Sequence, residues 1–305
     1  MSSASLAVIG SCILNGALAL LLAPLYEGLL RKLRAAIHSR VGPPVWQPYL
    51  DLLKLLGKED LRTSRGWLYA AAPAMALAAS LLLAMLVPMG ANPPLGFAGD
   101  IIVLLYVATL GAVMVMLAAF GSGSPYAYVG SSREMMMLLT VEPVLVVALV
   151  VAAVKAGTLS VGGILEWHAQ NGPTISMVIA GVAFFLALQA LAGKLPFDIP
   201  EADQEIMGGP LVEQSGPRLA LFRWGMWIRQ LVFAFLLVEL FVPWPRFDML
   251  PADLLLAAVK VLLVLILVAL VDVVNPRLRI DQAMSYFLRV GVTALAALAF
   301  AVIGL

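Results

Sequence analysis

The chain has 305 residues, of which 62% are hydrophobic and only 12% are charged, with a formal net charge of +1 and a mean hydropathy of +1.00. Soluble domains are about 45–50% apolar, so these values exclude a water-soluble fold, whereas a lipid bilayer accepts the apolar surface. The single cysteine, Cys12, excludes an internal disulfide framework and a thiolate cluster for zinc or iron–sulfur. No metal site is predicted, because His38 and His168 are far apart, and nothing in the charge balance favours a nucleic-acid partner.

Apolar runs long enough to cross a bilayer recur along the whole chain. A membrane helix needs about 20 mostly apolar residues. Eight runs meet this requirement, at Leu6–Tyr26, Trp67–Val87, Ile101–Phe120, Met135–Val154, Ile175–Ala192, Phe222–Val242, Leu254–Val274 and Phe287–Ile303. We therefore predict an all-α polytopic membrane protein with about eight transmembrane helices and amphipathic segments in the cytoplasmic loops, forming one integral membrane domain over residues 1–305.

The loops differ in charge from one end of the predicted helices to the other. Most lysine and arginine residues lie at one end, which includes the two longest polar stretches, about 27–66 and 193–221. The opposite loops hold only Lys155 and Arg246. Positive residues mark the cytoplasmic side. We expect a multi-pass protein of the cell inner membrane, with loops 27–66 and 193–221 in the cytoplasm and both termini outside.

The first long loop contains a turn followed by an amphipathic pattern. Gly42-Pro43-Pro44 predicts the turn. After it, apolar and aromatic residues recur at near-helical spacing, with Lys54 on the polar side. This pattern is typical of a helix lying in the membrane interface. The alternative is a surface helix that only anchors the loop.

The second long loop concentrates carboxylates beside the membrane. Asp198, Glu201, Asp203 and Glu205 fall within eight residues, and Glu213 follows. Pro200 suits the first position of a helix, which would place Glu201 and Glu205 on one face. Clustered carboxylates near apolar surface raise one another's pKa and titrate together, as proton transfer requires. The alternative is a solvated acidic loop.

Several ionisable residues fall inside the predicted spans, where each costs at least a few kcal/mol. Such residues usually face a bundle interior and mark an ion path. Snorkelling near a helix end is an equally good interpretation for Glu239 and Asp272, but a weak one for Glu142 and Lys260, which lie deeper. The remaining candidates are Glu134, near the start of its span, and Arg229.

Two motifs carry a resemblance to a known family. The first runs through Arg40-Val41-Gly42-Pro43, Gln47-Pro48, Asp51, Lys54-Leu55 and Lys58-Glu59. The second is Pro196-Phe197-Asp198-Ile199-Pro200-Glu201-Ala202-Asp203-Gln204-Glu205, followed by Glu213-Gln214-Ser215-Gly216. Together they resemble the heel subunit of respiratory complex I and of energy-converting membrane-bound hydrogenases, the NADH dehydrogenase subunit 1 family. The resemblance covers essentially the whole chain.

Details of these motifs favour the hydrogenase branch. The turn before Gln47 is more compact than in complex I proteins, and Gly193-Lys194-Leu195-Pro196-Phe197-Asp198 is similar to the form in formate hydrogenlyase. One position departs from many relatives, because Leu191 stands where they carry a glutamate two residues before the glycine. If that glutamate belongs to the proton route, the route differs in this chain.

The resemblance implies a function, partners and sites. It implies a membrane anchor and ion-coupling subunit of a nickel–iron hydrogenase complex such as formate hydrogenlyase, with no cofactor in this chain and with the nickel–iron centre and iron–sulfur clusters in partner subunits. The implied partners are hydrogenase large and small subunits, an iron–sulfur subunit and an antiporter-like membrane subunit. The candidate ion pathway comprises Glu134, Glu142, Asp198, Glu201, Asp203, Glu205, Glu213, Arg229, Glu239, Lys260 and Asp272. The candidate docking residues are Arg40, Gly42, Pro43, Gln47, Asp51, Lys54, Lys194, Phe197 and Asp198.

Two other functions remain open. The chain resembles complex I closely enough to be its quinone-chamber subunit. It also has the composition of a stand-alone transporter, although many transporters are built from repeated halves and this sequence shows no internal repeat.

Overall fold

The computed structural model describes residues 3–64, 66–89, 94–96, 100–245 and 250–304, so Arg65 and Arg246 lie outside the described residues. Within these ranges the protein is helical, and its only extended pairing is an isolated bridge between Asp100 and Ser160. The helices are α1 Ser3–Ile37, α2 Gln47–Leu56, α3 Trp67–Leu86, α4 Ile101–Ser122, α5 Pro125–Ala156, α6 Val161–Asn171, α7 Ile175–Leu191, α8 Asp203–Ile206, the 3₁₀ turn Gly209–Leu211, α9 Gly216–Phe241, α10 Leu250–Val274 and α11 Ile280–Ile303.

All eight predicted membrane helices are present. Among the described residues, α1, α3, α4, α5, α9, α10 and α11 are long and apolar enough to cross a bilayer, and the apolar α7 follows with 17 residues. Several helices continue past their predicted ends, since α1 reaches Ile37, α5 begins at Pro125 and α11 begins at Ile280. The charged residues in these extensions remain helical because many of them form ion pairs, such as Arg31 with Glu27.

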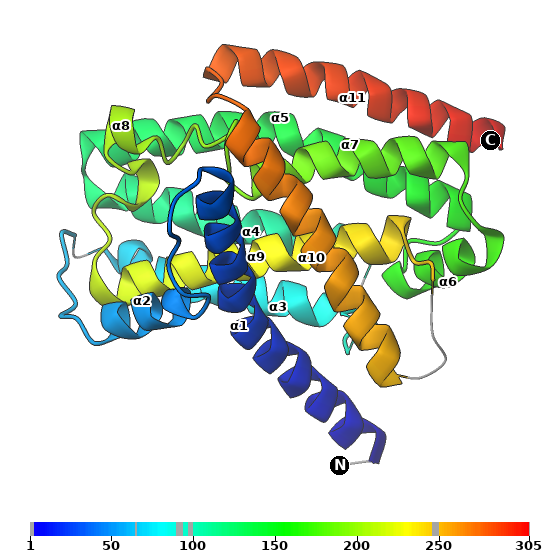
Figure 1. Ribbon diagram of the computed structural model, residues 1–305, viewed down its shortest axis with the longest axis horizontal. Coiled ribbons are helices and arrows are strands. Elements are labelled where there is room, and N and C mark those ends of the chain that lie inside the picture. Colours follow the sequence, from blue (N-terminus) through cyan, green and yellow to red (C-terminus); the bar gives the residue numbers. More distant parts are fainter. Residues whose placement is uncertain (1–2, 65, 90–93, 97–99, 246–249, 305) are drawn as a thin grey trace.

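The helices form one bundle around α9 (Figure 1). Helix α9 is the most deeply buried of the seven long spans and packs against α1, α3, α7 and α10. Figure 1 shows α1 and α10 crossing the bundle obliquely, with α2 and α8 at one end and α6 at the other. Both marked termini lie away from the end that carries α2 and α8. The two long polar stretches therefore meet at a single end of the bundle.

Ion pairs and hydrogen bonds join the first long loop to the start of α9. Arg218 on α9 lies 2.7 Å from Asp60 and donates to the Tyr69 carbonyl at 3.1 Å. The Tyr69 hydroxyl in turn donates to the Glu213 carbonyl. Gly216 has a φ of +53°, and a Cβ there would stand 2.6 Å from the Glu59 carbonyl oxygen. Glycine at this position lets the two loops approach closely, so they form one continuous surface.

The acidic loop differs from its predicted form. The helix expected to begin at Pro200 does not form, and between Pro200 and Ser215 only the short α8, Asp203–Ile206, and the 3₁₀ turn Gly209–Leu211 are helical. The backbone of Ala202, with φ −47° and ψ +85°, is not helical and so prevents a helix from continuing through it. Gly209, with φ +56°, packs directly against the Pro200 carbonyl. Glu201 and Glu205 therefore do not share a helix face. Glu201 faces the bundle, whereas Glu205 pairs with Arg133 at 2.7 Å.

Candidate functional site

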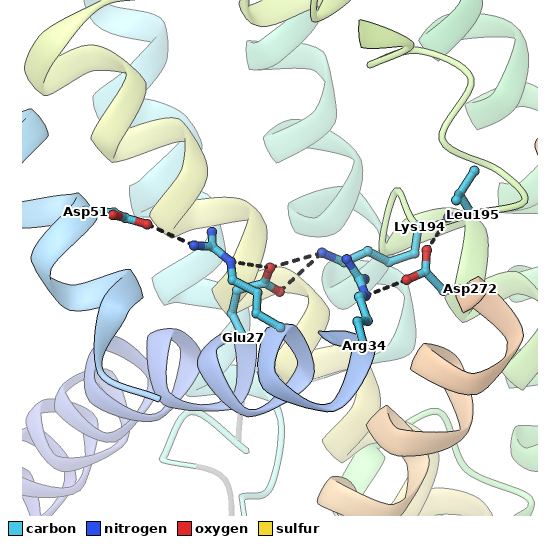
Figure 2. Close-up of polar contacts among 7 residues, drawn as sticks. Glu27, Arg34, Asp51, Lys194, Leu195 and Asp272 are labelled. Atoms are coloured by element: carbon cyan, nitrogen blue, oxygen red, sulfur yellow. Dashed lines mark hydrogen bonds and ion pairs between the residues drawn. The ribbon is translucent and has the colours of Figure 1, made fainter. Parts of the chain in front are cut away.

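A network of buried charges lies where α1 meets the acidic loop (Figure 2). Glu27, only 6% exposed, accepts from Arg31 one helical turn later at 3.2 Å and from the Lys194 ammonium at 3.2 Å. Arg31 also donates to Asp51 on α2 at 2.8 Å. Each buried charge is thus paired, as low-dielectric surroundings require. The network connects α1, α2 and the start of the loop.

A second set of pairs connects the acidic loop to α10 and α11. Asp272, near the end of α10, lies 2.5 Å from Arg34 and accepts a hydrogen bond from the Leu195 backbone N–H at 2.9 Å (Figure 2). Asp198 accepts from Arg277 at 2.7 Å. Between these contacts, Phe197 is buried, with its ring centroid 4.7 Å from that of Phe287. The loop is therefore held from Leu195 to Asp198, its first carboxylate.

Two adjoining cavities open beside this loop. The larger, which we term the loop cavity, has a volume of about 1140 Å³ including the space at its mouth, and its polar lining includes Glu27, Lys194, Asp203, Gln214 and Arg223. The smaller, termed the helix cavity, measures about 600 Å³ including the open space at its mouth, leaves about 50 Å³ for molecules of the size of water, and reaches between α5, α7 and α9. Its ionisable lining residues are Glu134, Asp198, Glu201 and Arg229. Glu201 lines both cavities, so it stands at their junction.

The carboxylates around these cavities differ in acidity. Burial, reinforced by the negative charge of Asp198, raises the pKa of Glu201 to about 7. Burial also raises the pKa of Asp198, although the bond from Arg277 opposes this. The hydrogen bond from Arg133 holds the pKa of Glu205 below its usual value. Of these three carboxyls, Glu201 is the one whose pKa is raised as far as about 7.

Buried amides give the loop cavity further hydrogen-bonding capacity. Both polar side-chain atoms of Gln214 and the Nε2 of Gln230 are buried without a partner among the described residues. Both glutamines line the loop cavity. Such groups are usually satisfied by internal water. A polar, hydrated path can therefore run from the loop cavity to Glu201.

The predicted ion-pathway residues fall into separate groups. Glu134, Asp198, Glu201, Asp203 and Arg229 line the two cavities, and Arg229 donates to the Leu191 carbonyl at 3.2 Å. Glu205 and Asp272 form the ion pairs described above, while Glu213 contributes its carbonyl to Tyr69.

The deeper residues of the predicted pathway lie apart from this group. Glu142 is half-buried and accepts from Thr109 on α4 at 2.6 Å. The ammonium of Lys260 donates to the carbonyls of Val242, Pro243 and Pro245 beyond the end of α9, so it satisfies that helix terminus. Glu239 is buried in the same helix, near its end. The structure thus brings together the candidates at the loop end of the bundle and not the whole predicted set.

The predicted docking residues also divide. Arg40 and Lys54 are exposed, Pro43 and Gln47 are half-buried, and Gln47 donates to Asp51 at 3.1 Å. Gly42 packs against Ala35 of α1. Lys194 and Phe197 point inward, one paired to Glu27 and the other buried, so they support the loop instead of presenting a surface.

Four charged residues of the two networks were missing from the predicted site: Glu27, Arg31, Arg34 and Arg277. A signal for Glu27 exists, because it lies at the end of an apolar run with Arg31 four residues later. Arg34 and Arg277 find their partners across long sequence separations, which a single sequence does not reveal. Among the described residues, no group of three or more His, Cys, Asp and Glu side chains is placed to hold a metal ion.

Comparisons with known proteins agree on one family. The family model described as NADH dehydrogenase matches residues 9–303. Hydrogenase-4 component C from Escherichia coli is 36% identical over 83% of this chain and 83% of its own length. Formate hydrogenlyase subunit 4 from the same organism is 35% identical over 85% of this chain and 87% of its own. The fold is also similar to that of a chain in a solved structure of the membrane-bound sulfane sulfur reductase, an archaeal respiratory membrane complex. The match covers 97% of this chain and 99% of that chain, with a TM-score of 0.90 and 30% sequence identity.

Proposed function

Because this chain belongs to the NADH dehydrogenase family, we propose that it is the membrane anchor and ion-coupling subunit of a hydrogen-evolving nickel–iron hydrogenase complex. In this role it docks the peripheral redox arm and links electron transfer there to movement of protons or sodium ions. The two hydrogenase-type relatives support this branch. The nickel–iron centre and the iron–sulfur clusters belong to the partner subunits.

The observation that carries the proposal is the position of Glu201. It lies between a polar cavity at the loop end of the bundle and a cavity that reaches Glu134 between the helices. A carboxyl with a pKa of about 7 exchanges its proton readily at neutral pH. A charge change in a partner that docks above the loop would alter this pKa and so move a proton. The ion path then leads along α5 toward Glu142, which follows Glu134 by eight residues, about 12 Å of helix.

The joined loops supply the surface for the peripheral arm. Loops 27–66 and 193–221 meet at one end of the bundle, where Arg40 and Lys54 are exposed. The hydrogenase large and small subunits and an iron–sulfur subunit would dock there from the cytoplasm, and an antiporter-like membrane subunit would lie beside the bundle. This arrangement requires the loops to be cytoplasmic and both termini to lie outside.

Copurification tests the proposal directly. The tagged chain, extracted in mild detergent from its own membranes, should bring down nickel and iron–sulfur subunits, identified by mass spectrometry and metal analysis. Arg40→Ala should weaken retention of the peripheral subunits. The matched change Lys155→Ala, at the opposite end of the bundle, should leave it intact. A chain that is active alone, without redox partners, would refute an anchoring role.

A quinone-chamber subunit of complex I is the second candidate, and the loop cavity favours it. Ligand pockets usually measure about 300–1,000 Å³, and the loop cavity without its open mouth, about 430 Å³, has room for a quinone head group. Recovery of a flavin-containing partner, together with binding of a quinone-site inhibitor, would support this candidate over the hydrogenase.

A further inference from the structure

A polar pocket with three arginines lies between the start of α5 and the start of α11, outside the cavities described above. We term it the headgroup pocket. It measures about 750 Å³, and its charged lining comprises Arg133, Arg277, Arg279, Glu205 and Asp281. The first turn of α11, at Ile280 and Asp281, also contributes to the wall, and the positive end of a helix dipole favours an anion there.

The arginines retain hydrogen-bonding capacity beyond their ion pairs. Arg133 meets Glu205 through Nη1, Arg277 meets Asp198 through Nη2, and Arg279 meets Asp281 through Nε. A guanidinium has five N–H donors, so each keeps several for another acceptor. The Nε of Arg277 is buried and has no partner among the described residues. Three such groups around one pocket suit the several oxygens of a phosphate.

An apolar groove lies farther along the same two helices. Its volume is about 1090 Å³, and it lies between α5, from Leu139 to Val147, and α11, from Met284 to Leu295. Its lining is aliphatic and aromatic apart from the hydroxyls of Thr140 and Ser285. At 1.5 Å per residue, it extends about 12 Å along α5 and about 16 Å along α11. Figure 1 shows α11 beside α5 at the edge of the bundle, where lipid has access.

The pocket and the groove are close to each other. Arg133 precedes Leu139 by six residues on α5, about 9 Å of helix, and Asp281 precedes Met284 by about 5 Å on α11. A phosphate site is thus placed at the polar end of an apolar groove whose length matches about half of a 30 Å hydrocarbon core. We propose that this α5–α11 face binds an anionic phospholipid, with its phosphate among the arginines and an acyl chain in the groove.

The length and the charge of the site select this occupant. A partner transmembrane helix would cover both leaflets, whereas the groove ends within one. The lining charges sum to +1 from three arginines and two carboxylates, which favours an anionic lipid over a zwitterionic one. Soluble phosphate would fill the pocket but leave the groove empty.

Native mass spectrometry of the detergent-purified complex tests the proposal, after exchange into an equal mixture of phosphatidylglycerol and phosphatidylcholine. The wild type should retain phosphatidylglycerol selectively, by several-fold. Arg279→Gln removes a pocket charge, and Gly291→Leu fills the groove, where an added Cβ meets only Val144 at 3.7 Å. Each should reduce that retention by several-fold. Arg289→Gln is the matched control, because Arg289 is an exposed arginine on α11 that lines neither feature.

The outcomes separate the alternatives. Equal retention of both lipids, or a similar loss in the Arg289 variant, would mean only a general attraction between charge and membrane and would overturn the site. A partner helix cross-linked into the groove would also overturn it. If the Gly291 variant does not fold, the test rests on Arg279→Gln, which should lose phosphatidylglycerol, and on Arg279→Lys, which should restore its retention. Retention unchanged in Arg279→Gln would then refute the proposal.

Discussion

Replacement of Glu201 by glutamine should change how the stability of this protein depends on pH. The pKa of this carboxyl is about 7 in the folded protein, against 4.5 for an ordinary glutamate. A shift of one pKa unit corresponds to about 1.4 kcal/mol, so the shift of about 2.5 units corresponds to about 3 kcal/mol. Because the folded pKa is raised, the folded protein holds a proton that the unfolded chain has already lost between pH 4.5 and 7. This contribution to stability is complete below pH 4.5 and is lost as pH rises through 7.

The assay is thermal unfolding in detergent at several pH values between 5 and 8.5. Glutamine does not titrate, so the unfolding temperature of Glu201→Gln should rise relative to wild type as pH increases. Because the unfolding entropy scales with chain length, 305 residues give about 1.5–2 °C per kcal/mol, so the change in the difference is roughly 5 °C. Glu205→Gln is the matched control, because the pKa of Glu205 is lowered and its titration lies below this range. If the unfolding temperatures of wild type and Glu201→Gln changed with pH in parallel, the pKa of Glu201 would not be raised in the folded protein.

The remaining predictions concern packing, charge balance, ion movement and topology. Phe197→Ala removes a buried ring 4.7 Å from Phe287 and should destabilise the protein by about 3 kcal/mol in denaturation, whereas Phe197→Leu should cost clearly less. Lys194→Met leaves Glu27 with a single cation and should cost about 3 kcal/mol; adding Glu27→Gln should recover part of this loss, and no recovery would argue against the pair. Glu142→Gln keeps the hydrogen bond from Thr109 and should leave the complex assembled. It should lower the ion transport that accompanies hydrogen production in vesicles, and unchanged ion transport would remove Glu142 from the path. A cysteine at exposed Lys54, with Cys12→Ser, should resist an impermeant thiol reagent in intact cells, and labelling from outside would reverse the orientation.

The membrane helices were predictable because apolar length is a local property. All eight runs are helical, and even Pro24 and Pro143 stay inside α1 and α5. The ends were less predictable. Helix α1 continues through Arg31 and Arg34 because their charges meet Glu27 and Asp272. A sequence shows the cations but not the carboxylates that will lie beside them.

The candidate site was likewise predictable in part. The acidic loop was recognisable as a cluster of carboxylates, and Glu134 and Glu201 do line one cavity. The different surroundings of Glu201 and Glu205 could not be deduced. The helix expected from Pro200 does not form, and Glu205 turns toward Arg133. Likewise, the depth of Lys260 in its apolar run does not reveal that its ammonium donates to three carbonyls beyond α9. Tertiary contacts, which sequence spacing does not encode, decide each of these cases.

The contacts of the acidic loop bear on the proposed role of Glu201. Lys194 attaches the loop to α1, the Leu195 N–H attaches it to α10, and Glu205 attaches it to α5. Glu201 lies between these attachments and has no ion-pair partner among the described residues. Its protonation state therefore changes the charge at the centre of a segment joined to three helices. Ion pairs therefore surround a carboxyl whose pKa is about 7, and the proposed function assigns the proton exchange to that carboxyl.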